Sequence, residues 1–202
     1  MPKKVDHHQR RELLAHAVRR VVADHGLGAV SLRSVAAEAG VTGGMVQHYF
    51  PTKEAMLDFA MRSASAQYGE RMQKALSTLG EAPEPTAALE AVLTALLPRS
   101  EQERADGRVA LAFMSHASLD SSAAEYLREG NDGMRMLLAD WIRSARDASG
   151  PAATAESESD APSAAAALLA LTDGLAIQVL SSGLDVDDAE SILRLHIAAV
   201  LA

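Results

Sequence analysis

An all-α protein is the fold class that this sequence predicts, on three observations. Valine and isoleucine are scattered along the chain and do not alternate with polar residues as in half-buried strands. No hairpin dipeptide separates two strand-like segments. Alanine is abundant, whereas proline and glycine fall mostly where one helical segment would give way to the next. With 48% hydrophobic residues among 202, the chain can bury a substantial core.

The first fifty residues are expected to form three helices. An apolar stripe that begins at Leu14 predicts the first helix, which Gly26 ends. Ser31 is a good N-cap for the second helix, and Gly40 supplies a tight turn after it. Thr42 is a second N-cap and precedes the third helix. These signals place the three helices at residues 6–25, 32–39 and 43–50.

The rest of the chain predicts a connecting helix and five more helices. The connecting helix, over 53–79, joins a head at 1–52 to a body at 53–202, and a proline-containing break follows at 80–86. Residues 149–163 are polar, acidic and proline-containing, which predicts a mobile loop. Further helices are expected at residues 86–97, 101–116, 121–148, 163–182 and 187–201.

Charge is unevenly distributed along the chain. Residues 1–50 contain seven Lys and Arg against four Asp and Glu, whereas the remainder contains twelve against twenty-three. Five of the seven histidines also lie in the first fifty residues. A basic head on an acidic body suggests that the head alone meets a polyanion, although a simply solvated surface gives the same counts.

Residues 31–50 have the spacing of a helix-turn-helix unit, because two short helices flank a turn at a glycine. Ala36 is small where the two helices would cross, and Val46 would point into the corner between them. The second helix of such a unit lies in the major groove of DNA. Gly43 and Gly44 in its first turn weaken the helix by about 1 kcal/mol each, but they let the backbone approach DNA closely.

The polar side chains around this second helix suit particular partners on DNA. Gln47 can pair bidentately with adenine, Met45 can touch a thymine methyl group, and Thr42 can add a hydroxyl contact. Three side chains at the flank are expected to contact phosphates without reading sequence: His48, Tyr49 and Lys53. A glycine-rich turn between two helices is also common in other helical proteins, and in that interpretation Tyr49 belongs to the core, as Phe50 does in either case.

Residues 13–57 carry a specific combination of motifs: a first helix ending in "DHG", then "S-x-x-x-V-A-x-x-A-G-V-T-x-G", then "H-Y-F-P-T-K-E-A-M-L". This stretch resembles the N-terminal domain of the TetR family of bacterial transcriptional repressors. The resemblance implies a three-helix DNA-binding head, a connecting fourth helix and a helical ligand-binding body. It also implies a homodimer that leaves its DNA operator when a small molecule binds.

The resemblance also implies roles for individual head residues. The base-proximal positions are Arg33, Gly43, Gly44, Met45 and Gln47, and the phosphate-proximal positions are Ser31, Thr42, His48, Tyr49 and Lys53. The sequence departs from the family at Gln47, where many members carry a tyrosine, and at Gly43, which is often lysine or another polar residue. These departures are expected to change the operator that is read and to leave DNA binding itself intact.

Residues 170–197 resemble the C-terminal helix pair of the subgroup that includes the choline-responsive repressors. That likeness implies dimerisation by a four-helix packing of two helices from each subunit. Helical spacing of the apolar residues agrees with it, although the same stripes suit an intramolecular core. The expected interface residues are Leu171, Leu175, Val179, Leu193, Ile197 and Val200.

A ligand pocket in the body would combine bulky, adaptable side chains with a few polar groups. The candidates that helical spacing brings to shared faces are Phe113, Met114, His116, Met134, Leu137, Trp141, Asp173 and Gln178. Methionine and aromatic stripes of this kind are also common in a plain core. A choline-type cation favours an aromatic cage, and aromatics make up only 3% of the chain, so that ligand is not expected here.

Other functional classes receive little support from the sequence. Without cysteine, disulfides and thiolate zinc sites are excluded, which suits the cytoplasm. No apolar run approaches the ~18 residues of a membrane span. His116 and Asp120 are four residues apart, but no catalytic motif accompanies them, so an enzyme, a metal site or a cofactor is not expected. A helical scaffold protein is the remaining alternative to a ligand-responsive repressor, and it does not explain the basic head.

Overall fold

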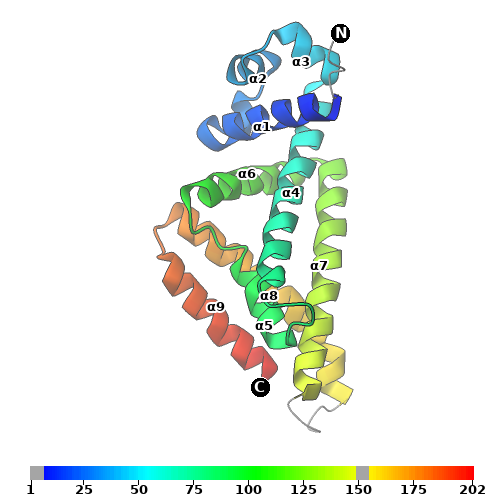
Figure 1. The fold of residues 1–202 in the computed structure, drawn as a ribbon, viewed down its shortest axis with the longest axis vertical. Coiled ribbons are helices and arrows are strands. Elements are labelled where there is room, and N and C mark those ends of the chain that lie inside the picture. The colour runs from blue at the N-terminus through cyan, green and yellow to red at the C-terminus, as the bar shows by residue number, and fades with distance from the viewer. Residues whose placement is uncertain (1–6, 149–154) are drawn as a thin grey trace. The chain divides into compact units, whose positions relative to one another are not determined.

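A computed structural model describes residues 7–148 and 155–202, and every regular element in these two ranges is helical (Figure 1). The all-α prediction is therefore confirmed, and most helix ends lie within two residues of their predicted positions. The elements are α1 (His7–His25), the 3-10 helix η1 (Leu27–Ala29), α2 (Leu32–Ala39), α3 (Gly43–Tyr49), α4 (Lys53–Ser77), α5 (Pro85–Thr94), α6 (Glu101–Ala117), α7 (Ser121–Ala148), α8 (Ala155–Ser181) and α9 (Val186–Leu201).

The loop predicted over 149–163 is wrong for its second part. Residues 149–154 lie outside the described residues, but α8 begins at Ala155 and carries Pro162 inside it. Proline removes one helical hydrogen bond at this point. Ala161 and Ala165, both 0% exposed, pack this same turn into the core, and that burial offsets the lost bond.

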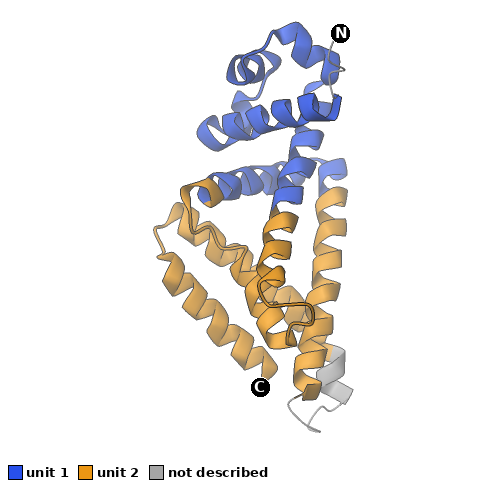
Figure 2. Ribbon diagram, in the orientation of Figure 1, with its two compact units in different colours: residues 1–67, 104–124 blue, residues 68–103, 125–202 orange. Residues whose placement is uncertain are grey.

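The described chain divides into two compact units (Figure 2). Unit 1 comprises residues 1–67 and 104–124, and unit 2 comprises residues 68–103 and 125–202. The helices α4, α6 and α7 each contribute residues to both units. This division differs from the predicted boundary after residue 52, because the first part of α4 and most of α6 belong with the head.

Unit 1 is built on α1, against which α2 packs, while α3 packs on α2. Val46 in the middle of α3 and Phe50, the residue that caps its C-terminus, are both 0% exposed, so Phe50 faces the core as expected. The other large buried side chains of unit 1 come from α1, the turn before α2, α2, the first part of α4 and α6, and they are Leu14, Val18, Val21, Val22, Val30, Val35, Met56, Leu57, Met61, Val109 and Phe113. This interior fixes the inner face of α3 and leaves its opposite face exposed.

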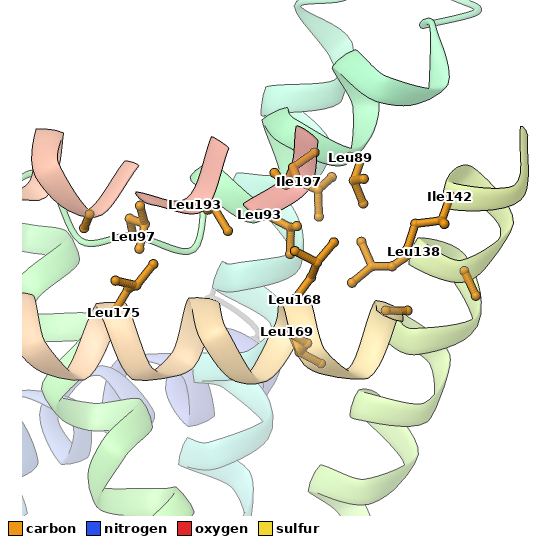
Figure 3. Close-up of a cluster of buried hydrophobic side chains, with 14 of the residues drawn as sticks. Leu89, Leu93, Leu97, Leu138, Ile142, Leu168, Leu169, Leu175, Leu193 and Ile197 are labelled. Atoms are coloured by element: carbon orange, nitrogen blue, oxygen red, sulfur yellow. The ribbon is translucent and has the colours of Figure 1, made fainter. Parts of the chain in front are cut away.

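Unit 2 has a continuous leucine-rich core (Figure 3). Its side chains come from α5, the turn after α5, α7, α8 and α9, and Figure 3 shows Leu168 of α8 close to Leu93 and Ile197. The largest fully buried members are Leu89, Leu93, Leu97, Leu138, Ile142, Leu168, Leu193 and Ile197. An interior of this extent is completed by a single chain.

This core contains most of the residues predicted for the dimer interface. Leu175, Val179, Leu193 and Ile197 are at most 4% exposed within one chain, so they have no surface left to offer to a second chain. The two remaining predicted residues, Leu171 and Val200, are partly buried against the same core. The apolar stripes were identified correctly as helical, but most of their area is covered by a neighbouring helix of the same chain.

The outer side of α8 carries small exposed residues such as Ala167 and Ala170, and its described large apolar side chains are buried or partly buried. The segment Asp160–Ser181 is long and apolar enough to span a membrane, with a mean hydropathy of 1.6. The sequence analysis expected no segment of this kind. Only 33% of that segment is buried within the chain. Its buried side includes Leu168 and Thr172, so α8 is a core helix of unit 2 that also carries an uncovered apolar side.

The middle of α7 has little packing around it. All six residues from 128 to 133 are exposed, and two of them, Gly130 and Gly133, have no atom within 4 Å of an added Cβ. The helix is buried on either side of this stretch, through Ala123 in unit 1 and through Leu138 in unit 2. Its two ends are therefore anchored in different units.

Candidate nucleic-acid interface

The turn between α2 and α3 is held by local hydrogen bonds that the sequence anticipated. At the start of α2, the backbone N–H of Ser34 donates to Ser31 Oγ at 3.1 Å, and Ser31 N–H donates to Ser34 Oγ at 2.9 Å. Gly40 ends the helix with φ 65°, a left-handed conformation that favours glycine. Val41 N–H then donates to the Ala36 carbonyl at 2.9 Å and closes the turn.

Helix α3 begins at an N-cap threonine and has two distinct faces. The backbone N–H of Met45 donates to Thr42 Oγ1 at 3.3 Å, as the sequence predicted for a cap. Val46 is completely buried, while Met45, at 37% exposed, and Gln47 face solvent. The exposed face therefore presents the residues predicted to be near DNA bases, and the fold does not use them for its own packing.

Nothing in the fold of the chain explains why positions 43 and 44 of α3 are glycine. Neither Gly43 nor Gly44 has a positive φ, and an added Cβ at either position would meet no atom within 4 Å. In Gly40, by contrast, the backbone conformation itself requires glycine. Each glycine in a helix interior costs about 1 kcal/mol relative to alanine. The fold of the chain therefore does not itself require glycine at either position.

Three aromatic rings meet at the flank of this face, and sequence analysis identified only two of them. The Tyr49 ring lies 5.1 Å from the His48 ring and 5.4 Å from the His7 ring, measured between centroids, and the two imidazoles are 6.2 Å apart. His7 comes from the first turn of α1, whereas the other two belong to α3. Only the count of histidines in the head hinted at His7.

The basic side chains of the head differ in whether they interact with other residues of the chain. Arg20 forms an ion pair with Glu38, and the Arg11 guanidinium lies over the Phe59 ring at 4.4 Å. Arg33 and Lys53 are exposed, and neither has an ion-pair partner within the described part of the chain. These last two side chains, both predicted to be near DNA, are available to an external anion.

A buried polar network joins α1 to α4 within unit 1. Arg19 is 8% exposed and donates from its guanidinium to Ser63 Oγ, and the Ser63 hydroxyl donates to Glu12 Oε2 at 2.7 Å. Burial lowers the pKa of Arg19, while the charges of Glu12 and Asp106 oppose that shift. Burial also lowers the pKa of His16, with repulsion from Arg19 adding to it. The network fixes the head helix α1 on the first part of α4.

Comparison with known families decides the identity of this arrangement. Residues 14–59 match the family described as "Bacterial regulatory proteins, tetR family", and residues 85–202 match "BetI-type transcriptional repressor, C-terminal". The chain belongs to the TetR family. It is therefore a DNA-binding transcriptional regulator that responds to a ligand, and not an enzyme or a scaffold protein.

Individual relatives of this TetR-family chain cover nearly its whole length. The regulator PksA of Bacillus subtilis (strain 168) is 28% identical over 204 residues, which is 99% of this chain and 94% of the relative. A transcriptional regulator from Rhodococcus sp. Rha1 has a crystal structure with TM-score 0.80, 33% identity and 95% coverage of both chains. A regulator from Saccharomonospora viridis in complex with choline has the same fold, with TM-score 0.80, 22% identity, and 95% and 96% coverage.

A cavity of about 240 Å³ lies inside unit 1, between α4, α6 and the start of α7. Phe113 and His116, two of the eight residues predicted for the ligand pocket, are among its lining residues. Sequence analysis missed its other polar members, although His116 and Asp120 had been noticed as a pair. The complete lining is Glu54, Ala55, Leu57, Asp58, Met61, Phe113, His116, Asp120, Ser122 and Ala123.

The other six residues predicted for the ligand pocket do not line this cavity. Met114 is 42% exposed on α6, and the remaining five belong to unit 2. Of these, Met134 and Trp141 pack against the leucine-rich core, while Leu137 and Gln178 are exposed. Asp173 is partly buried, and burial raises its pKa above the ordinary aspartate value. Within unit 1, the cavity therefore includes two of the eight predicted residues, and the role of the other six stays a prediction.

Proposed function

We propose that the exposed face of α3 enters the major groove of a double-stranded DNA operator and reads its sequence. The glycine pair at 43 and 44 carries this proposal, because neither backbone conformation nor packing explains it. A helix without side chains in its first turn lets its backbone lie against DNA at the cost of helix stability. Gln47 and Met45 on the same exposed face are then within reach of base edges.

The remaining predicted residues divide by the partner that each suits. Gln47 is proposed to read one base pair, and Arg33 to lie beside the bases from α2. Lys53, at the first position of α4, is proposed to contact a phosphate. The same positioning role is proposed for Ser31, Thr42, His48 and Tyr49. A DNA-bound role of this kind also implies a cytoplasmic location.

The test compares these two kinds of contact in a gel-shift titration with fragments of the protein's own promoter region. Gln47→Ala should weaken binding by about 1–3 kcal/mol on the cognate base pair and relax specificity there. Lys53→Ala should weaken binding equally on all sequences and reduce the salt dependence, because fewer counterions are released. If both variants lose the same affinity on every DNA sequence, the roles assigned to Gln47 and Lys53 are wrong. If the native protein retards no DNA fragment at low salt, the docking of α3 is wrong.

We further propose that the cavity of unit 1 holds the small-molecule effector. A ligand against Glu54, Asp58 and Met61 would touch the first turns of α4, which follow directly after α3 in the chain. A ligand that prefers one arrangement of these helices shifts the population between DNA-binding and released states. The mixed lining of carboxylates, one imidazole and apolar side chains gives a small polar ligand both anchoring and contact surface.

The effector proposal is tested by DNA release in a screen of small compounds. A compound that releases DNA from the native protein should fail on His116→Ala, which removes a lining residue. The control is Gln178→Ala, an exposed residue of α8 outside the cavity. Equal release from both variants would place the effector elsewhere.

We propose that the uncovered apolar side of α8, together with the outer side of α9, forms a homodimer interface. Ala167 and Ala170 are exposed on α8, and Leu195 is 68% exposed on α9. A dimer would place two heads on half-sites about 34–36 Å apart.

Leu195→Glu should lower the mass measured by light scattering to that of a monomer. The matched control is Leu119→Glu, since Leu119 is 91% exposed in the turn before α7; two unchanged masses would exclude this interface.

A further inference from the structure

We propose that His7 contacts the DNA backbone, so that the first turn of α1 belongs to the DNA-binding surface. This inference rests on the proposed docking of α3. It adds a residue from a different helix, one that neither the helix-turn-helix motif nor the family resemblance identifies. The contact is to a phosphate or sugar oxygen and therefore positions the head without reading sequence.

The geometry of the three rings carries the argument. His7 is exposed, yet its ring lies 5.4 Å from the Tyr49 ring and 6.2 Å from the His48 ring. His48 is exposed as well, and its ring meets the Tyr49 ring edge to face at 83°. Because Val46 and Phe50 face the core, the cluster lies on the side of α3 away from it. The rings of His7, His48 and Tyr49 thus form a surface cluster next to Gln47.

The chemistry of this cluster suits an anion. An imidazole presents at least one N–H donor, and a tyrosine presents an O–H donor, so the three side chains bring several donors to one point. Arg10 and Arg11 follow one turn further along α1, and Lys53 begins α4 four residues after Tyr49. Arg11 is directed toward the Phe59 and Phe50 rings, at 4.4 and 5.2 Å. Among residues 7–148 and 155–202, the side chains of His7, His48 and Tyr49 form ring contacts and no hydrogen bond, so their donors are available to an external acceptor.

Packing between rings gives His7 a fixed position that an isolated surface histidine lacks. Aromatic pairs at centroid separations of ~4.5–7 Å are favourable, and all three separations here lie in that range. A side chain already held in place loses less entropy when it binds. A purely structural role, in which His7 only ties α1 to α3, predicts that any ring at this position would serve equally well.

Two substitutions separate the direct contact from the structural role. His7→Phe keeps a ring for packing but removes both nitrogen atoms, and His7→Ala removes the ring as well. We expect each variant to lose about three- to tenfold in DNA affinity, as for the loss of one ordinary hydrogen bond at an exposed site. The loss should be the same on operator DNA and on unrelated DNA. His25→Ala, an exposed histidine at the other end of α1, should bind as the native protein does.

Neutral methylphosphonate substitutions in the operator locate the contact. At the phosphate that His7 contacts, the substitution should weaken the native protein and leave the affinity of His7→Phe unchanged. If His7→Phe binds DNA with native affinity, the inference is wrong, whatever the affinity of His7→Ala. If Lys53→Ala and Gln47→Ala also bind normally, the docking of α3 itself is wrong; if those two lose affinity while the His7 variants do not, only the present inference fails.

Discussion

Ser63→Ala tests whether the buried network between α1 and α4 stabilises the head. The Ser63 hydroxyl accepts a hydrogen bond from Arg19 and donates one to Glu12 at 2.7 Å. Hydrogen bonds to charged groups contribute about 1.5–3 kcal/mol each. Arg19 is 8% exposed, so solvent screens this site little. Since the guanidinium and the carboxylate still attract one another after the hydroxyl is lost, the expected cost is about 2 kcal/mol, below the sum of two bonds.

Urea unfolding and thermal unfolding measure this cost. For a chain of this size, ~2 kcal/mol corresponds to a fall in Tm of about 4–8 °C. Ser65→Ala is the matched control, because Ser65 lies two positions along the same helix, is likewise partly buried, and has no hydrogen bond to Arg19 or Glu12. Equal stability of the two variants would refute the reasoning, since it would mean that the network contributes nothing beyond the loss of a hydroxyl from α4.

Three further changes have predictable signs. Gly40→Ala should cost about 1 kcal/mol, because its φ of 65° is strained for alanine, whereas Gly130→Ala in α7 should gain about 0.5–1 kcal/mol, both measured by urea unfolding. Burial raises the pKa of Asp173 above its unfolded value, so its ionised carboxylate destabilises the folded chain at neutral pH. Asp173→Asn should therefore raise the Tm at pH 7, and this gain should shrink as the pH falls through the raised pKa toward about 3.9. A gain that persists unchanged at pH 3 would contradict this assignment.

The local structure of the head could be predicted from sequence because short-range signals determine it. Ser31 and Thr42 cap the helices that follow them, and Gly40 takes the left-handed conformation that ends α2. Each of these features depends on hydrogen bonds between residues at most five apart. The exposed face of α3 followed as well, since burial of Val46 and Phe50 leaves only one face for the others.

Features that depend on which helix covers which could not be predicted. The spacing of Leu193 and Ile197 predicts an apolar helix face but does not show what covers that face. In the structure, other helices of this chain cover it. The start of α8 was missed because burial of Ala161, a long-range effect, outweighs the proline that follows it. His7 was missed for a similar reason, since its neighbours Tyr49 and His48 come from a different helix.

The exposed middle of α7 has a consequence for how the protein opens locally. Residues 128–133 make no buried contact, and two of them are glycines, each of which lowers helix stability by about 1 kcal/mol. Backbone amides there should exchange with deuterium faster than those near Ala123 or Leu138, which are held in unit 1 and unit 2. The helix is therefore expected to open locally at this stretch before it opens at either buried end.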